Sequence, residues 1–327
     1  MGIKVGVIGT GKLGREHVRV LKSIPEVDHV ACFDIVGERS QEVASKFGAE
    51  AFTDARGMME SVDAVSVVVP TVSHREVSLM AIECGNNVFL EKPIAASVDH
   101  AREIISAAKE SQRILQIGHI ERFNPAVREA LPHVGSPSFI EIHRLAPFNV
   151  RGIDVSVIMD LMIHDIDLLS WFIGKRPVDI REKGAAVLTE APDIVNARVE
   201  YDDGCVANLT ASRVSIKPMR KVRIFTGESY LSVDLLKGEF RRFKKGKRFD
   251  ETVARLKSDD LNPASVSLTD ILEIESKKGD DEEPLFRELQ SFCRTVSGGE
   301  RPEVTGEDGL TALEVATEIQ SRVEASR

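Results

Sequence analysis

The chain has 327 residues, of which 42% are hydrophobic and 29% are charged. This length and composition are typical of a soluble globular protein with two domains, each large enough to form its own core. The formal net charge of −9 argues against general binding to nucleic acid or to an anionic membrane, and no apolar run is long enough to span a bilayer.

The cysteines and the first residues indicate the compartment. The four cysteines are scattered without a C-x-x-C pair, so neither a zinc site nor a disulfide framework is indicated. Met1 is followed at once by a strand-like run, which lacks the basic, apolar and cleavage regions of a signal peptide. We therefore expect a cytoplasmic protein.

The first element is a short apolar strand from Ile3 to Ile8, which ends in a glycine-rich turn. The turn is Gly9-Thr-Gly11-Lys-Leu-Gly14, and a helical pattern follows it through Leu21. A G-x-G-x-x-G motif between a strand and a helix predicts a dinucleotide-binding turn, with the pyrophosphate at the helix N-terminus. A plain structural turn is the alternative, and the flanking strand and helix make it the weaker one.

The second strand, from Val30 to Phe33, ends in Asp34. An acidic residue about 20 residues beyond the last glycine of the motif is expected to accept hydrogen bonds from the adenosine ribose hydroxyls, and Asp34 has this spacing from Gly14. Its charge would repel a 2′-phosphate, so NAD is favoured over NADP. Arg39 weakens this preference, because it could stack on adenine or reach a phosphate.

The strand–helix alternation continues with strands from Ala64 to Val69, from Asn87 to Leu90 and from Ile114 to Ile117. This spacing predicts a doubly wound parallel sheet, a Rossmann domain of residues 1–119, with ligands at the carboxyl ends of its strands. Lys92 follows one of those ends and is therefore predicted to lie beside the cofactor. A solvated surface lysine is the ordinary alternative, but Pro93 stiffens the turn that holds it.

After residue 119 the alternation stops, and residues 120–327 are predicted to form an α+β domain with an open, mostly antiparallel sheet. Its strands are expected at Phe139 to Leu145 and in five runs between residues 179 and 235, two of them joined by an Asp202-Asp203-Gly204 hairpin turn. Amphipathic helices are predicted from Leu285 to Val296 and from Leu310 to Val323. The C-terminal helix, about 308–327, is expected to pack back on the body of the protein.

Asp160 and His164 are the main catalytic candidates in this second part. They lie four residues apart in an apolar, helix-like run, so they share one helix face and can point into the same cleft. A histidine titrates near neutral pH, and a neighbouring carboxylate can orient it as a general base. The alternative is a helix start in which Asp160 is the cap and His164 is a half-buried structural residue.

Two basic stretches are interpreted as surface. The run from Arg241 to Arg248 is offset by acidic neighbours, which favours a solvated loop or hairpin face over a nucleic-acid patch. A second group of cations between Arg213 and Arg223 could meet a diphosphate, and we assign it no role. Residues 257–280 are mostly polar and are predicted to be a variable region.

Together these motifs resemble the signature of the glucose–fructose oxidoreductase / inositol dehydrogenase (Gfo/Idh/MocA) family. The matching stretches are the Gly9–Gly14 turn, Asp34, Glu91-Lys92-Pro93, Asp160-x-x-x-His164-Asp-x-Asp and the closing Pro302-Glu-Val-Thr-Gly-Glu-Asp308-Gly-Leu. The resemblance covers almost the whole chain, least clearly residues 240–285. It implies NAD as cofactor, no metal, and a homo-oligomer, a dimer or a tetramer, which the sheet of the second domain often mediates.

The resemblance also implies the reaction and its residues. Hydride leaves a sugar carbon while the hydroxyl proton passes to His164, held by Asp160, and Lys92 stabilises the developing alkoxide. The residues expected to bind the cofactor are Gly9, Thr10, Gly11, Lys12, Leu13, Gly14, Asp34, Arg39, Pro70, Thr71, His74, Glu91 and Lys92. Those expected to bind the substrate are Lys92, His119, Arg122, Asn124, Asp160 and His164.

The stretch from Gly118 to Pro125 looks most like the family members that oxidise nucleotide sugars. It implies oxidation of the 3-hydroxyl of UDP-N-acetylglucosamine, with a possible aminotransferase partner that uses the keto sugar for an amino-sugar lipid A. Three alternatives stay open, because one fold hosts many activities. They are a dehydrogenase of inositol or another polyol, an NAD-dependent glycoside hydrolase, and a non-catalytic protein that senses NAD.

Overall fold

The structure is a computed structural model that describes all residues except 1, 150–154, 259, 263–265, 299–300 and 327. It contains two compact units, described separately below. The first comprises Met1–Phe123 and Glu282–Glu318, and the second comprises Asn124–Asp281 and Ile319–Arg327.

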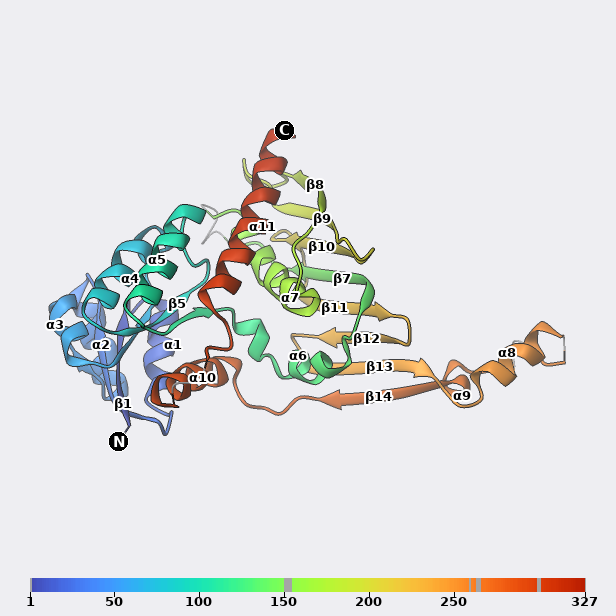
Figure 1. Ribbon diagram of the computed structural model, residues 1–327, viewed down its shortest axis with the longest axis horizontal. Helices are drawn as coiled ribbons and strands as arrows, with labels where there is room; N and C mark the ends of the chain where they lie inside the picture. Colours follow the sequence, from blue (N-terminus) through green and yellow to red (C-terminus); the bar gives the residue numbers. More distant parts are fainter. Residues whose placement is uncertain (1, 150–154, 259, 263–265, 299–300, 327) are drawn as a thin grey trace. The chain divides into compact units, whose positions relative to one another are not determined.

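The first unit contains the blue and teal part of the ribbon in Figure 1. Its sheet has six parallel strands in the order β3-β2-β1-β4-β5-β6. This is the strand order of a Rossmann fold, as predicted. The strands are β1 (Ile3–Ile8), β2 (Val27–Phe33), β3 (Glu50–Ala51), β4 (Ala64–Val67), β5 (Asn87–Glu91) and β6 (Leu115–Gly118). The helical segments are α1 (Lys12–Leu21), α2 (Gly37–Phe47), α3 (Ala55–Ser61), η1 (Thr71–Ser73), α4 (His74–Glu83), α5 (Val98–Glu110), η2 (Ile120–Phe123), α10 (Pro284–Gly298) and most of α11 (Gly306–Ala325).

The first unit includes a segment that the sequence-based prediction placed in the second domain. Helix α10 follows β6 only after the whole of the large second sheet has intervened in the chain, yet Leu289 and Phe292 belong to the same apolar core as Val5 and Val18. Phe292 also meets Phe89 of β5 edge to face, with ring centroids 5.8 Å apart. The amphipathic stripe of α10 is therefore buried against the Rossmann core, which supplies the hydrophobic surface that such a helix needs.

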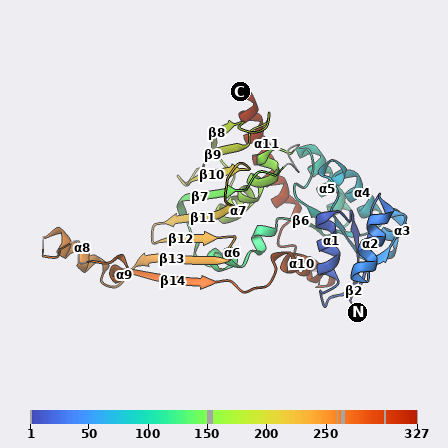
Figure 2. The same cartoon turned by 180° about the vertical axis from the view of Figure 1, so that it is seen from behind.

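The second unit contains an eight-stranded sheet in the order β14-β13-β12-β11-β7-β10-β9-β8 (Figure 2). Every pair is antiparallel except β7 with β10, in agreement with the predicted mostly antiparallel sheet. The strands are β7 (Pro137–Leu145), β8 (Asp179–Ala185), β9 (Ile194–Glu200), β10 (Val206–Ser212), β11 (Met219–Thr226), β12 (Ser229–Asp234), β13 (Glu239–Lys245) and β14 (Leu272–Lys278). The helical segments are α6 (Pro125–Ala130), η3 (Leu131–His133), η4 (Ile158–Met162), α7 (Ile163–Ile173), α8 (Phe249–Lys257) and α9 (Leu268–Ile271).

Strands β13 and β14 lie where the sequence predicted a solvated loop or hairpin face and a variable region. The basic run from Arg241 is mostly strand β13, and β14 lies inside the stretch interpreted as a variable region. The two strands pair over their whole length and lead to α9 and α8 at their far end (Figures 1 and 2). Some of their cations face carboxylates, as in Lys244 Nζ to Glu273 Oε2 at 3.0 Å, and such cross-strand pairs offset part of the positive charge of this hairpin.

The cations between Arg213 and Arg223 also have partners within the second unit. Arg223 lies 2.8 Å from Glu141, and Lys221 lies 3.8 Å from Asp234. The buried Arg213 donates to the carbonyl of Val155. These contacts favour a structural role over diphosphate binding for the three side chains.

Helix α7 is attached to the sheet by a buried ion pair. Arg144 of β7 donates from Nε and Nη2 to Oδ1 of Asp165, at 2.9 and 2.7 Å, and both side chains are 2% exposed. Two opposite charges buried together at this distance stabilise one another strongly, whereas either charge alone would be costly to bury.

Replacing Arg144 by alanine should therefore destabilise the second unit. The Asp165 carboxylate would lose its cation while remaining buried, so the free energy of unfolding should fall by about 3–5 kcal/mol. The measurement is urea unfolding followed by the fluorescence of Trp171. Arg181→Ala is the control, because its pair with Asp179 is exposed and should contribute about 1 kcal/mol or less. Equal effects in the two variants would contradict a special role for the buried pair.

Candidate functional site

The glycine turn has the geometry that the motif predicts. Gly9 adopts φ +89°, and its N–H donates to the carbonyl of Phe33 at 2.9 Å. A Cβ at Gly14 would lie 1.8 Å from the carbonyl oxygen of Gly9, whereas a Cβ at Gly11 would meet nothing within 4 Å. Gly14 thus permits close packing of α1 on the turn, and the backbone at Gly11 stays open to a ligand. A pyrophosphate fits there, in front of the unpaired N–H groups that begin α1.

Asp34 lies at the end of β2 and is held by the turn. Its Oδ2 accepts hydrogen bonds from the Thr10 N–H at 2.7 Å and the Thr10 hydroxyl at 3.2 Å, and its Oδ1 accepts from the Val36 N–H at 2.9 Å. A carboxylate has about four acceptor positions and three are used here, so Asp34 retains about one position for a ribose hydroxyl. The structure thus places Asp34 beside the glycine turn, as the spacing predicted.

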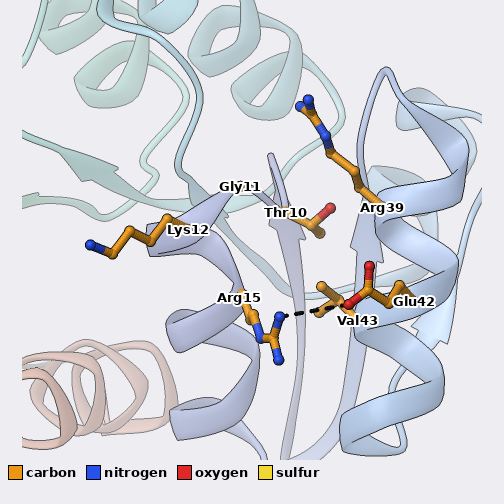
Figure 3. A pocket seen from close by; sticks show the side chains of 7 residues that line it. All are labelled: Thr10, Gly11, Lys12, Arg15, Arg39, Glu42 and Val43. Atoms are coloured by element: carbon orange, nitrogen blue, oxygen red, sulfur yellow. Dashed lines mark ion pairs between the residues drawn. The ribbon is translucent and has the colours of Figure 1, made fainter. Parts of the chain in front are cut away.

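Two cavities adjoin this turn within the first unit. The first is about 540 Å³ and has mostly apolar walls; it is lined by Gly9, Gly11, Asp34, Arg39, Val69, Pro70, Val77, Met80 and several neighbours. The second is about 410 Å³ and is lined by Thr10, Gly11, Lys12, Arg15, Arg39, Glu42 and Val43 (Figure 3). Figure 3 shows Arg15 of α1 facing Glu42 of α2, at 3.7 Å, while Lys12 points away from this pair. The larger cavity has the size and apolar lining of a nucleotide pocket.

The segment after β4 contains three predicted cofactor residues, Pro70, Thr71 and His74. Pro70 lines the larger cavity and Thr71 opens η1. His74 is 1% exposed, and its ring nitrogens lie 2.9 Å from the Pro93 carbonyl and 3.0 Å from the Val69 carbonyl. His74 thus connects the end of β4 to the turn after β5, which is a supporting role; cofactor contact by its ring stays a prediction.

Lys92 follows the last residue of β5 and is half-buried. The neighbouring Glu91 was predicted to contact the cofactor. Its carboxylate faces the interior, where Oε1 lies 3.2 Å from His17 Nε2, and it also accepts from the Lys92 N–H at 3.2 Å. Cofactor contact by Glu91 stays a prediction. The two side chains of this motif therefore have different surroundings.

The Gly118–Pro125 stretch is largely packed inside the protein. His119, Arg122 and Asn124 are 1%, 3% and 6% exposed. Arg122 lies 3.3 Å from Asp308 within the first unit. Asn124, in the second unit, caps α6 by accepting from the Ala126 N–H at 3.1 Å. Substrate binding by these residues stays a prediction, and the contacts observed for Arg122 and Asn124 stabilise the fold.

Asp308 belongs to the C-terminal motif and is held tightly. It accepts from the Thr305 N–H at 2.8 Å and from the Thr305 hydroxyl at 2.7 Å. Burial acts to raise its pKa, but Arg122 and the Thr305 hydrogen bonds outweigh burial and hold the pKa below its usual value. The motif around Pro302 therefore anchors the start of α11 to η2 within the first unit.

Asp160 and His164, in the second unit, occupy an irregular helix. Asp160 lies in the π-helical turn η4, and His164 follows in the first turn of α7. The prediction assumed one regular α-helix, whereas i→i+5 turns widen the spacing; such turns occur often at functional sites. Both side chains are half-buried, while Asp165 and Asp167 are 1% exposed.

Metal-ligating and thiol side chains can be located in the part of the chain that the structure describes. No group of three or more His, Cys, Asp and Glu side chains there could hold a metal ion. Burial raises the pKa of Cys32 and Cys205 to about 11 and that of Cys293 to about 12. These thiols are therefore poor nucleophiles at neutral pH.

The comparisons with known proteins agree with this geometry. Residues 3–119 match the model of the oxidoreductase family with an NAD-binding Rossmann fold, and residues 134–230 match the GFO/IDH/MocA C-terminal domain. The chain is 34% identical over 326 residues to UDP-N-acetylglucosamine 3-dehydrogenase of Acidithiobacillus ferrooxidans, covering 99% of this chain and 98% of that one. The chain belongs to the Gfo/Idh/MocA family.

Other members of this family are also similar. A solved structure of the Acidithiobacillus enzyme superposes with a TM-score of 0.88 at 33% identity, covering 99% of each chain. Myo-inositol 2-dehydrogenase of Thermotoga maritima is 25% identical over 99% of this chain and 97% of its own. As a Gfo/Idh/MocA member, the chain is an oxidoreductase that binds NAD, for which the glycine turn and Asp34 are suited. None of the described helices has both the length and the apolar composition needed to cross a membrane.

Two buried polar residues next to the Glu91-Lys92-Pro93 motif were not predicted from the sequence. They are His17 of α1 and Ser66 of β4, both 0% exposed. His17 lies three residues after Gly14 and four before Leu21, on the buried face of α1. The helical period could have placed it inside the protein, but its partner Glu91 is four strands further along the chain, on β5, and no local pattern connects the two.

The buried state of His74 should make the first unit sensitive to acid. Burial lowers its pKa, against the hydrogen bonds to Val69 and Pro93. As the pH falls through 6.5, the unfolded chain takes up a proton before the folded chain does, so the free energy of unfolding should decrease. Urea unfolding followed by circular dichroism between pH 5 and pH 8 should show a smaller decrease for His74→Asn than for the wild type. The exposed His100→Asn is the control, and parallel curves for wild type and His74→Asn would contradict the assignment.

Proposed function

We propose that the chain oxidises the 3-hydroxyl of UDP-N-acetylglucosamine to a ketone, with NAD as the hydride acceptor. The observation that supports this most is the 34% identity, over 98% of its length, to an enzyme named for that reaction. The glycine turn, Asp34 and the apolar cavity beside them are consistent with a dinucleotide in the first unit.

In this proposal Lys92 acts on the oxygen that loses its proton. Its ammonium group belongs to the residue that follows the buried strand β5, and a cation is most effective where negative charge develops in the transition state. Its half-buried position supports this role, because partial burial reduces the screening of its charge by water. The residue would bind the substrate and stabilise its alkoxide.

His164 is proposed as the general base and Asp160 as the group that orients it. An imidazole is well matched to accept a proton near neutral pH. The buried Arg144–Asp165 pair is adjacent in sequence to His164 and holds α7 on the sheet of the second unit, so the imidazole is attached to a rigid helix. NAD, when bound, supplies the hydride-accepting chemistry, while the protein provides binding, orientation and proton transfer.

We further propose that the enzyme is a cytoplasmic homo-oligomer whose keto product is used by an aminotransferase. A row of half-buried aromatic rings on one face of the large sheet supports self-association. The ring centroid of Phe225 lies 5.8 Å from that of Phe139 and 4.8 Å from that of Tyr230. The Tyr230 centroid lies 5.2 Å from that of Phe243. Such a surface is more typical of an interface than of a solvated sheet.

The substrate can be tested by NADH absorbance with purified protein, NAD and a panel of UDP-sugars and inositols. We expect NADH to form with UDP-N-acetylglucosamine, and to accumulate further when an aminotransferase or a carbonyl trap removes the ketone. NADH formed only with inositol would favour the polyol dehydrogenase, which the similarity to myo-inositol 2-dehydrogenase makes the second candidate. Free sugar released without NADH would indicate a glycoside hydrolase, and NAD binding without any turnover would favour the sensor.

The catalytic roles predict the behaviour of two variants. Lys92→Ala and His164→Ala should each lower kcat by about 10²–10⁴-fold, the range for loss of a positioned acid–base or electrostatic group. The dissociation constant of NAD, from fluorescence titration, should change little. Lys175→Ala is a control, because that lysine pairs with Asp202 and Asp203 at the surface. Activity near that of the wild type in either variant would remove that residue from the mechanism.

A further inference from the structure

A buried chain of polar groups connects α1 to the turn that holds Lys92. His17 of α1 is 0% exposed, and its Nδ1 lies 2.8 Å from the hydroxyl of Ser66 on β4. Its Nε2 lies 3.2 Å from Oε1 of Glu91, close but without the alignment of a strong hydrogen bond. The imidazole ring rests edge to face on Phe89, with the centroids 5.6 Å apart.

The hydrogen-bonding capacity of these groups determines which of them donates and which accepts. An ionised carboxylate only accepts hydrogen bonds, so the His17 nitrogen that faces Glu91 must hold the proton. In a neutral ring the other nitrogen, Nδ1, is then an acceptor, and the Ser66 hydroxyl can supply its proton. Ser66 donating to His17 thus satisfies Nδ1, while Nε2 is directed at Glu91 without an aligned hydrogen bond, and this arrangement requires no buried positive charge on the ring.

Two further contacts hold the Glu91 carboxylate in place. Its Oε2 accepts from the backbone N–H of Lys92 at 3.2 Å. Its carboxyl group also lies directly over Gly118 of β6, where a Cβ would be 3.1 Å from all three carboxyl atoms. The carboxylate therefore fills a space defined by α1, β6 and the Lys92 backbone, and it cannot move without disturbing one of them.

We infer that His17 and Glu91 are positioning residues, which hold the backbone of Lys92 so that its ammonium group is directed at the reacting oxygen. The inference rests on the proposed role of Lys92. His17 lies on the helix whose first turn follows Gly11, so one rigid element supports both the pyrophosphate turn and the lysine. On the other side of the turn, His74 contacts the Pro93 carbonyl at 2.9 Å, so a buried histidine holds each end of the Glu91-Lys92-Pro93 motif.

The test compares His17→Leu, which removes both polar contacts, with His17→Gln, which keeps a donor for Glu91. A small displacement of a catalytic group can cost about 10²-fold in rate, so His17→Leu should lower kcat by about 10- to 100-fold. The KM for the sugar and the dissociation constant of NAD should stay within about threefold, since ground-state binding is not the affected step. His17→Gln should recover most of kcat.

Val20→Ala is the matched control for loss of stability. Val20 is on the same helix and is 1% exposed, but it belongs to the apolar core. The Val20→Ala substitution should reduce thermal stability while leaving kcat unchanged. If His17→Leu lowers kcat no more than Val20→Ala at equal stability, or if His17→Gln is as slow as His17→Leu, the inference is wrong. If His17→Leu does not fold, Glu91→Gln can replace it, because glutamine has nearly the same shape as glutamate. Glu91→Gln should likewise lower kcat while leaving the dissociation constant of NAD nearly unchanged.

Lys92→Ala separates this inference from the proposed function. Full turnover by Lys92→Ala would overturn the role of the lysine, and the inference with it. If Lys92→Ala is slow while His17→Leu and Glu91→Gln turn over normally, only the positioning role is wrong. If Lys92 is catalytic and His17 positions it, His17→Leu should cause no further loss of kcat in a Lys92→Ala background, because both substitutions act through the Lys92 ammonium group.

Discussion

The close approach between helix α1 and the carbonyl of Gly9 is the constraint on which the first unit depends. Gly14 has no side chain, so the helix can begin directly against the turn; any Cβ would meet the Gly9 oxygen at 1.8 Å. This contact sets where the free N–H groups of α1 point, and it places His17, less than one helical turn further on, opposite Glu91. One steric requirement near the start of the chain therefore determines both the anion-binding turn and the support of a lysine that follows β5, far along the sequence.

The second unit uses an electrostatic constraint for a similar purpose. The Arg144–Asp165 pair is buried at 2% exposure on both sides, so its geometry tolerates little movement before an uncompensated charge results. It holds α7 on β7, while the preceding π-helical turn keeps Asp160 in an irregular backbone. A rigid helix preceded by an irregular turn is a suitable support for an imidazole and its carboxylate, since rigid elements locate side chains more accurately than loops do.

Much of the fold was predictable from local signals. Five of the parallel strands of the first unit are short apolar runs, and the glycine turn and Asp34 lie at their ends, so the parallel sheet and the cofactor turn follow from pattern and spacing. Strand β3 was not predicted, because it consists of two exposed residues, Glu50 and Ala51. Strand β14 was not predicted, and β13 only as one of two alternatives, because most of their residues are charged and the hydrophobic alternation of a half-buried strand is weak there. Helix α10 was predicted as a helix but assigned to the second domain, because its partners, Val5 and Val18, lie near the opposite end of the chain.

The candidate site was predictable at the level of motifs and less so at the level of single side chains. A motif states which residue types occur together, whereas the structure shows which of them face inward. In Glu91-Lys92-Pro93 the carboxylate contacts His17 and the Pro93 carbonyl contacts His74. In the Gly118–Pro125 stretch Arg122 pairs with Asp308 and Asn124 caps α6. These inward contacts explain why the motifs extend beyond the catalytic residues themselves. A lysine can be directed at one atom only if the backbone that holds it is fixed. A fixed backbone in turn requires that the polar groups around it are satisfied inside the protein.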